Sequence, residues 1–412
     1  MYRVGNFITN YSILLIVGAL LALVWANIDA TSYHHFVDFV LIDDFIIGHA
    51  HADEHGHIHR TLTLHYLIND VLMALFFAIA AKEVWEAIIL KNGSLRGKRA
   101  LTPLFATAGG MFGPITVYLG IALILGSDTF NAVARGWAIP TATDIAFSYL
   151  VGRLVFGAGH PAVRFLLLLA IADDAAGLII LAVFYPSGEL APSWLLLSFA
   201  ASLGVFVFFN WLPRRLDRGD QSRQRSTWTR KKLNYWPYLV AGCLSWFGFQ
   251  ESGLHPALGL LPIVPTLPHA DRAFGIFAEA EVHLHDLLNQ CEHLLKQPVE
   301  IILFFFGLVN AGVEFSAIGS PTWLVLAGLL VGKPVGILLF GWVAAKPMGL
   351  GIPAGMRIID LVVIGCVAAI GFTVSLFIAS VAFDAGPVQD AAKMGALFSF
   401  AAAIISIAAG KI

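Results

Sequence analysis

Long apolar segments follow one another along almost the whole chain, separated by short stretches that carry charge, glycine or proline. An α-helix needs about 20 mainly apolar residues to cross the hydrocarbon core of a bilayer. The pattern therefore predicts an all-α integral membrane protein with about twelve membrane helices. The expected extents are 11–28, 64–90, 100–124, 136–155, 161–185, 193–212, 234–250, 254–268, 286–313, 321–344, 357–383 and 389–410.

Lysine and arginine gather in alternate loops, and most densely in the loop 213–233. The loops between them, including 31–62, carry mainly acidic residues. Because short cytoplasmic loops are enriched in Lys and Arg, this alternation places both termini in the cytoplasm. We expect one transmembrane domain over 1–412, with 31–62 as an external loop and 213–233 as a basic cytoplasmic loop.

Composition supports the membrane assignment. The chain is 58% hydrophobic and 13% charged, with a mean hydropathy of +0.79, whereas soluble domains carry about 25% charged residues. The net charge of −2 gives no sign of a nucleic-acid partner. The three cysteines are scattered through different segments, which argues against a disulfide framework or a structural zinc site.

Two adjacent aspartates, Asp173 and Asp174, lie at the centre of the segment 161–185. A charged side chain at the bilayer midplane costs at least ~2.5–3.5 kcal/mol, and neighbouring like charges each disfavour the ionisation of the other. Such residues face a protein interior or a water-filled cavity and mark an ion or proton path. This pair is therefore the first candidate for function.

Further polar or helix-breaking residues fall at the same depth. Lys333 lies in the tenth segment, and Asp144 follows Pro140 in the fourth. Pro140 removes a backbone donor, so we expect the fourth helix to unwind near 141–143. Gly371 interrupts the eleventh segment, but a glycine alone is a weak sign of a break because glycine is common in membrane helices. Broken helices expose partial charges at their ends, which a carboxylate or an ammonium group can offset.

Structural roles remain open for some of these groups. Lys333 can simply neutralise Asp173 or Asp174, and Asp144 can act only as a helix cap. The structural alternative is weaker for the aspartate pair, because one counter-charge does not satisfy two carboxylates.

Several segments resemble the signature segments of the NhaA-type sodium/proton antiporters, in the family's order and over nearly the whole chain. These segments are GWAIPTATDIAF, LLLLAIADDAAGLIILAVFY, VGKPVGI, IGFTVSLFIASVAF, NDVLMALFFAIAAKEV, GGMFGP, SGLHPALGLL and FGLVNAGVEF. The resemblance implies twelve helices with two inverted three-helix repeats, in which the fourth and eleventh helices are discontinuous.

The resemblance also implies roles for individual residues. Asp174 resembles the principal cation ligand, and Asp173 resembles its partner, which pairs with the lysine at Lys333. Thr143 and Asp144 match the Thr-Asp of the unwound fourth helix. Residues that resemble the pH-response positions of the family are Asp70, Glu83, His255, Glu292 and His293. Trp85 and Glu86 depart from the Lys and Arg that usually follow the Glu83 position.

The implied function is export of Na⁺, and also Li⁺, in exchange for H⁺ by alternating access, in a bacterial inner membrane. The resemblance further implies electrogenic, pH-regulated transport for sodium and pH homeostasis, with no cofactor and no enzymatic reaction. The external loop 31–62 would form a β-hairpin that helps to form a homodimer.

Histidines cluster in the same external loop, at His49, His51, His55, His57 and His59. Clustered histidines can bind zinc or nickel. The alternative, which we favour, is a solvated loop whose histidines titrate near pH 6.5.

Rival functions fit the sequence less well. Intramembrane aspartyl proteases also use two membrane aspartates, but on separate helices and with a Gly-x-Gly-Asp motif, which is not present in this sequence. A passive channel would show filter-like rings or repeated pore loops, and neither is evident in this sequence. A transporter of the same fold for an organic anion is the main alternative; such a site needs more room and usually has no midplane lysine opposite paired aspartates.

Overall fold

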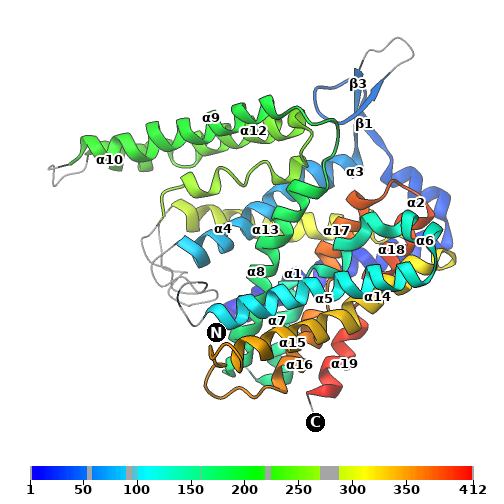
Figure 1. Cartoon of the computed structure of the whole chain (residues 1–412). Coiled ribbons are helices and arrows are strands. Elements are labelled where there is room, and N and C mark those ends of the chain that lie inside the picture. The colour runs from blue at the N-terminus through cyan, green and yellow to red at the C-terminus, as the bar shows by residue number, and fades with distance from the viewer. Residues whose placement is uncertain are drawn as a thin grey trace. The chain divides into compact units, whose positions relative to one another are not determined.

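The computed structural model describes residues 2–52, 58–89, 95, 97, 100–157, 159–218, 224–269 and 287–410. The described chain is mostly helical, and it divides into two compact units. The first unit contains residues 1–39, 94–180 and 303–412, and the second contains 40–93 and 181–302. Figure 1 shows the elements of each unit.

The first unit is built from helices. Its elements are α1 (Tyr2–Ile28), α2 (Ala30–Val37), α5 (Leu101–Ile124), α6 (Ser127–Val133), the 3-10 helix η3 (Ala134–Thr141), α7 (Ile145–Phe156), α8 (Pro161–Phe184) as far as residue 180, α13 (Leu287–Asn310) from residue 303, η10 (Phe315–Ala317), α14 (Ser320–Ala327), the π-helix η11 (Gly328–Gly332), α15 (Lys333–Ala345), α16 (Asp360–Ala368), α17 (Phe372–Ala382), α18 (Pro387–Phe398) and α19 (Ala401–Ala409).

Facing glycines bring α5 and α15 into backbone contact, and the two helices run side by side in Figure 1. A Cβ at Gly109 would lie 2.1 Å from the Gly336 carbonyl oxygen, and a Cβ at Gly113 would lie 2.2 Å from that of Gly332. Small residues spaced in this way allow membrane helices to approach closely. Lys333 lies between the two contact points. Its neighbour Pro334 has no N–H to donate to the preceding turn, and the backbone widens into η11 just before it.

The second unit combines a small sheet with helices. Its elements are β1 (Val40–Ile42), β2 (His49–Ala52), β3 (Ile58–Thr63), α3 (Leu64–Tyr66), the π-helix η1 (Leu67–Leu72), α4 (Met73–Ile89), η4 (Pro192–Trp194), α9 (Leu195–Val205), the π-helix η5 (Phe206–Trp211), α10 (Leu212–Leu216), α11 (Gln224–Trp228), the π-helix η6 (Thr229–Leu233), α12 (Trp236–Ser252), η7 (Pro256–Leu258) and η8 (Val264–Thr266).

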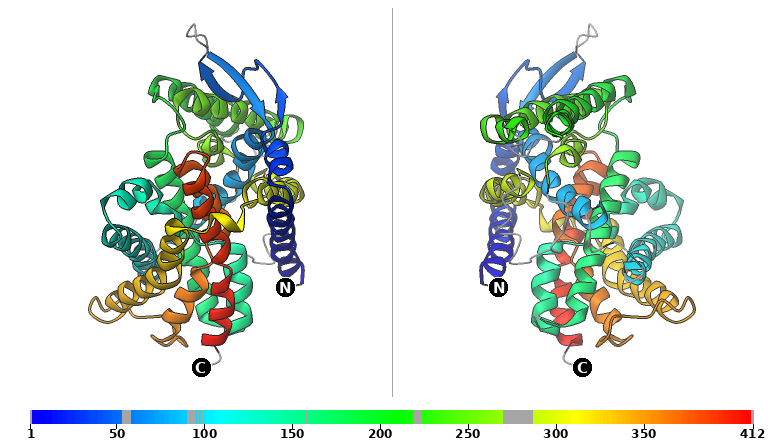
Figure 2. Two further views of the ribbon diagram at one scale, coloured as in Figure 1. Left: turned by 90° about the vertical axis from the view of Figure 1, so that its right-hand side faces the viewer. Right: turned by 90° about the vertical axis from the view of Figure 1, so that its left-hand side faces the viewer.

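The sheet is antiparallel in the order β1-β3-β2. His51 pairs with His59, and the pairing of β1 with β3 is interrupted by a bulge between Val40 and Ile42. Figure 2 shows the sheet next to the end of α12, where Arg60 of β3 forms a 2.9 Å ion pair with Glu251. All strand residues except Thr63 lie within the loop 31–62.

The basic loop 213–233 is held by a local set of hydrogen bonds. Asp217, just after α10, accepts hydrogen bonds from the backbone N–H and the hydroxyl of Ser226, at 2.7 and 2.6 Å, and from the Arg225 N–H at 3.3 Å. These bonds favour the carboxylate and hold the pKa of Asp217 below its ordinary value. Residues 219–223 of this loop lie outside the described part of the chain.

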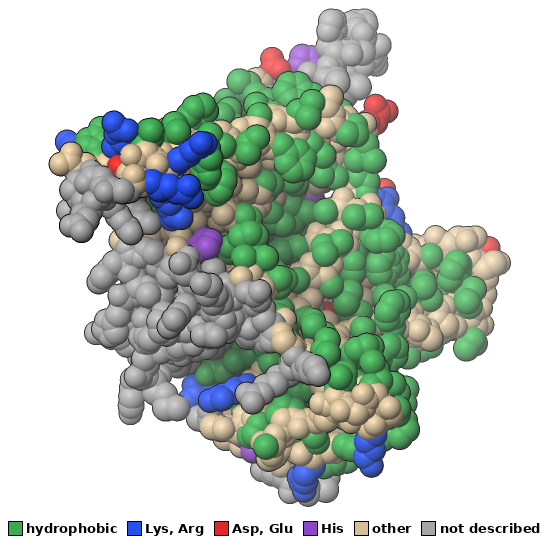
Figure 3. Space-filling view, turned by 60° about the vertical axis from the view of Figure 1, so that its left-hand side comes forward, with side chains coloured by type: hydrophobic (Ala, Val, Ile, Leu, Met, Phe, Trp, Pro, Cys, Tyr) green, Lys and Arg blue, Asp and Glu red, His purple; other side chains and the backbone are tan. Residues whose placement is uncertain are grey.

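Length and hydropathy identify six membrane-length helices among the described residues, or seven if the bent pair α16–α17 is one span. The six are Leu64–Ile89, Leu101–Ile124, Pro161–Phe184, Pro192–Leu216, Ser320–Ala345 and Pro387–Ala408. Their outer faces carry exposed large hydrophobic side chains, such as Leu196 and Phe199, and hydrophobic side chains dominate the face drawn in Figure 3. Such faces suit contact with lipid.

The predicted helix 254–268 was wrong. This segment contains only the short 3-10 helices η7 and η8, joined by turns. Its prolines, which lack the N–H that a helix needs, are Pro256, Pro262, Pro265 and Pro268. Most of the segment is buried, which suits irregular backbone at membrane depth.

Candidate functional site

Two helical segments of the first unit are broken, and both breaks contain the residues that the sequence singled out. The 3-10 helix η3 ends at Thr141, and extended backbone leads through Asp144 into α7. The helix α16 ends at Ala368, and α17 begins at Phe372 after a bend of 50°. Gly371 suits this second break, because a Cβ there would lie 2.8 Å from the carbonyl oxygen of Ala142.

Asp144 joins the two breaks. Its Oδ1 accepts a hydrogen bond from the Phe147 N–H of α7 at 3.2 Å. Its Oδ2 accepts from the Thr373 N–H of α17 at 3.3 Å and from the Thr373 hydroxyl, and its own N–H donates to the Ile370 carbonyl at 2.7 Å. One buried carboxylate therefore caps the N-terminal ends of two helices, where the helix dipole favours negative charge.

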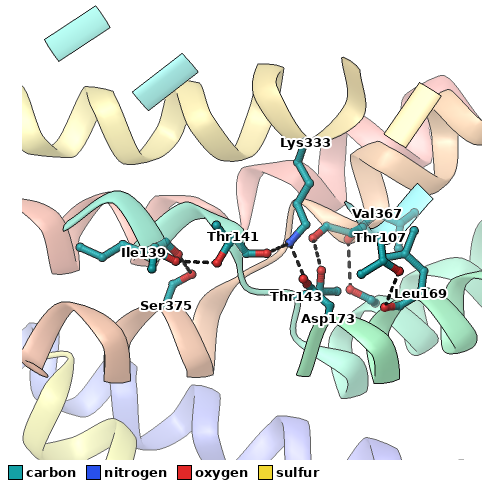
Figure 4. Close-up of polar contacts among 12 residues, drawn as sticks. Thr107, Ile139, Thr141, Thr143, Leu169, Asp173, Lys333, Val367 and Ser375 are labelled. Carbon is teal, nitrogen blue, oxygen red and sulfur yellow. Dashed lines mark hydrogen bonds and ion pairs between the residues drawn. The ribbon is translucent and has the colours of Figure 1, made fainter. Parts of the chain in front are cut away.

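Lys333 contacts the first break at Thr141, where η3 ends, and is fully buried. Its Nζ is 3.0 Å from Asp173 Oδ2 and also donates to the carbonyl oxygen of Thr141, at the C-terminal end of η3 (Figure 4). The ammonium group is thus compensated by a carboxylate and by the negative end of a helix. A buried charge needs such partners, because its desolvation is costly.

The two adjacent aspartates have different surroundings. Asp173 is 4% exposed and contacts Lys333, whereas Asp174 is only half-buried. Successive residues of an α-helix are rotated by about 100°, so both carboxylates cannot face the same lysine. Asp174 still lies close enough to interact electrostatically with Lys333. Lys333 therefore pairs directly with Asp173.

Thr143 connects the break to the aspartates. Its hydroxyl donates to the Ala368 carbonyl at 3.1 Å, at the end of α16. Its backbone and side chain also lie within hydrogen-bonding reach of the Asp173 carboxylate. The structure therefore brings together Thr143, Asp144, Asp173 and Lys333, with Asp174 on the adjoining helix face. The carboxylate, hydroxyl and carbonyl oxygens are ligands that suit a hard cation.

The sequence of this chain matches a known family over nearly its full length. The sequence model described as Na⁺/H⁺ antiporter 1 matches residues 6–410. The chain is 78% identical to the Na⁺/H⁺ antiporter NhaA of Jannaschia sp. (strain CCS1), over all of this chain and 98% of the relative. It is 46% identical to the Na⁺/H⁺ antiporter NhaA of Desulfitobacterium hafniense (strain Y51), over 99% of this chain and 95% of the relative.

The chain belongs to the Na⁺/H⁺ antiporter 1 family.

A further relative is the Na⁺/H⁺ antiporter NhaA of Geobacter sulfurreducens, with 42% identity over 98% of this chain and 97% of that protein. A solved structure of the sodium proton antiporter MjNhaP1 from Methanocaldococcus jannaschii covers 98% of this chain and 95% of its own, with a TM-score of 0.45 and 14% identity. That likeness is too small to bear on the fold. Together with the apolar helices, the family membership shows a multi-pass membrane protein.

The pH-response candidates of this antiporter-family member all lie in the second unit. His255 Nδ1 is 3.7 Å from Asp70 Oδ1, and both side chains are buried. Glu83 is half-buried on α4, and His293 is exposed on α13. Glu292 forms an ion pair of 2.7 Å with Lys82 of α4.

Lys82 was not among the residues predicted from the sequence, yet it pairs with one of them, Glu292. Its Nζ also lies 2.9 Å from Glu86 Oε2, one helical turn away, so it joins two acidic side chains. Glu86 is therefore part of an ion network, and Lys82 and Glu86 lie close enough to Glu83 to act on it electrostatically. The signal was present in the sequence, because a lysine inside an apolar span calls for a partner.

The histidines of the loop 31–62 show no metal centre in the part of the chain that is described. No group of three His, Cys, Asp or Glu residues among the described residues is placed to hold a metal ion. His49 packs edge-on against Tyr66, and His59 Nδ1 lies 3.1 Å from Asp44 Oδ1. His55, His57 and the side chain of His51 lie outside the description.

Proposed function

We propose that this protein exports Na⁺, and also Li⁺, in exchange for H⁺ across a bacterial inner membrane, for sodium and pH homeostasis. One observation carries the proposal: two adjacent aspartates lie at a crossing of broken helices, with buried Asp173 paired to Lys333 and Asp174 half-buried beside it. The names of the relatives, which are Na⁺/H⁺ antiporters, support the same exchange.

Na⁺ and protons compete for the same carboxylate oxygens, and the exchange follows from this competition. Asp174 is the principal cation ligand, and Asp173 and Thr143 supply further oxygens. Protons on the carboxylates release Na⁺, and Na⁺ binding releases protons. When Na⁺ binds, the attraction between Lys333 and Asp173 weakens, and the site gives up more protons than the one cation it takes. Net charge then moves in each cycle, so transport is electrogenic.

We propose the architecture that the family resemblance implies. The single domain 1–412 has twelve membrane segments, of which 254–268 is irregular, and both termini are cytoplasmic. Inverted repeats span the third to fifth and the tenth to twelfth segments, and rocking around the fixed site gives alternating access. The sheet within 31–62 provides a homodimer contact.

Transport by the purified protein in liposomes tests this proposal. With a pH-sensitive dye inside, Na⁺ or Li⁺ added outside should move protons out of the liposomes, and K⁺ should not. A membrane potential set with K⁺ and valinomycin should change the rate of Na⁺-driven proton movement. Absence of any Na⁺-dependent proton flux would refute the exchange. A proton flux that does not change with the membrane potential would refute only the claim that transport is electrogenic.

We also propose that the Lys82 ion network, defined here as Lys82, Glu86 and Glu292, sets the pH at which transport begins. Lys82→Met would leave acidic side chains of α4 and α13 without their shared cation. Like charges disfavour ionisation, so we expect the midpoint of the pH–activity profile to move up by about 1 pH unit.

The measurement is Na⁺-driven proton flux against pH at saturating Na⁺. Lys346→Met, which removes an exposed lysine after α15, is the matched control and should leave the profile unchanged. A Lys82→Met profile that overlays the wild type would exclude the network from pH control.

A further inference from the structure

Backbone carbonyls at the ends of the broken helices η3 and α16 accept hydrogen bonds from side chains. The last carbonyls of a helix have no partner within the helix, and a buried polar group without a hydrogen bond is costly. At this crossing, side chains from the opposite break supply the donors. The Ser375 hydroxyl donates to the Ile139 carbonyl at 2.7 Å, and the Ser148 hydroxyl donates to the Val367 carbonyl at 3.1 Å.

The two bonds are reciprocal. Ser148 lies on α7, after the first break, and bonds to α16, before the second. Ser375 lies on α17, after the second break, and bonds to η3, before the first. Both serines are fully buried. Figure 4 shows Ser375 beside Ile139, with Thr141 between this pair and Lys333.

Each bonded carbonyl lies next to a group of the proposed cation site. Ile139 is two residues before Thr141, whose carbonyl accepts the hydrogen bond from Lys333. Val367 precedes Ala368, whose carbonyl accepts from Thr143. A shift of either helix end would therefore move a group that contacts Asp173, directly or through Lys333.

We propose that Ser148 and Ser375 are positioning residues for cation binding. They hold the ends of η3 and α16 in the places where Thr143 and Lys333 meet Asp173, and they do not contact the cation themselves. This inference rests on the proposed function, because it concerns the affinity of the same site. Neither serine was recognisable from the sequence as part of the site.

The test measures Na⁺-driven proton flux by full-length protein in liposomes for Ser148→Ala and Ser375→Ala. Each variant removes a buried hydrogen bond that holds the end of one broken helix, although the Val367 carbonyl keeps its bond from the Ile370 N–H at 3.3 Å. Each variant should therefore raise the KM for Na⁺ by about 5- to 10-fold. The maximal rate should change much less, because the carboxylates that exchange the ions are retained.

Ser406→Ala is the matched control. Ser406 is also fully buried in a helix of the first unit, but its hydroxyl donates to Ala402 of its own helix at 2.6 Å. Its KM should equal that of the wild type. If Ser375→Ala does not fold, Ser375→Cys keeps the volume with a weaker donor and should raise the KM by a smaller factor.

Three results would overturn the inference. The first is an unchanged KM in both alanine variants, and the second is a reduced maximal rate with unchanged KM, which would make the serines structural only. The third is an equal rise of KM in Ser406→Ala. If the wild type shows no Na⁺-dependent proton flux, the proposed function is wrong. If the wild type is active, the results for the variants test only the role of the two serines.

Discussion

Replacing Asp174 by asparagine is expected to abolish Na⁺-dependent proton movement while the protein still folds. Asparagine keeps the size of the side chain but cannot ionise, so it neither attracts Na⁺ as an anionic ligand nor takes up the competing proton. Asp174 is half-buried, whereas Asp173 is buried and paired with Lys333. Its loss should therefore affect transport more than stability.

The measurement is Na⁺-dependent dissipation of ΔpH in everted membrane vesicles, where the variant should match vesicles that lack the protein. Asp360→Asn is the control, because Asp360 is also a buried carboxylate of the first unit but accepts the Arg357 N–H at 2.8 Å, outside the site. Undiminished dissipation in the Asp174 variant would remove this residue from the mechanism.

The second large effect is expected from Lys333→Met, which should destabilise the protein and stop transport. The lysine is fully buried, and its loss leaves Asp173, at 4% exposure, without its counter-charge. Removing one partner of a buried ion pair typically costs about 3–5 kcal/mol, whereas replacing both partners is often neutral. The Thr141 carbonyl would also lose its donor.

Thermal unfolding of the detergent-solubilised protein measures this effect. Lys333→Met should unfold at a clearly lower temperature, and Asp173→Asn combined with Lys333→Met should recover most of the loss without restoring wild-type transport. Lys346→Met, at an exposed position, should unfold like the wild type. A single Lys333→Met variant as stable as the wild type would show that Asp173 does not need the lysine.

The break at Gly371 depends on a distant contact, because a Cβ there would lie 2.8 Å from the carbonyl oxygen of Ala142. The break in the fourth helix was predictable, because its cause is local: Pro140 removes a backbone donor just before residues 141–143. The prediction of a helix over 254–268 failed on the same principle: apolar character was given more weight than its prolines, although each removes a backbone donor.

Contacts between distant segments were harder to predict from the sequence. Helical rotation shows that Asp173 and Asp174 face different ways, but which of them meets Lys333 depends on how α8 packs against α15. Ser148 and Ser375 look like ordinary small residues of membrane helices. Their partners, Val367 and Ile139, are backbone carbonyls far away in the sequence, and no residue type marks a carbonyl that needs a donor.

The central claim is that the aspartate pair exchanges Na⁺ for protons, and proton release on Na⁺ binding tests it most directly. Purified protein in a weakly buffered solution with a pH indicator should release protons when NaCl is added, and should not when KCl is added. Asp174→Asn should release none. Saturable Na⁺ binding without proton release, or the same release from the Asp174 variant, would contradict the account.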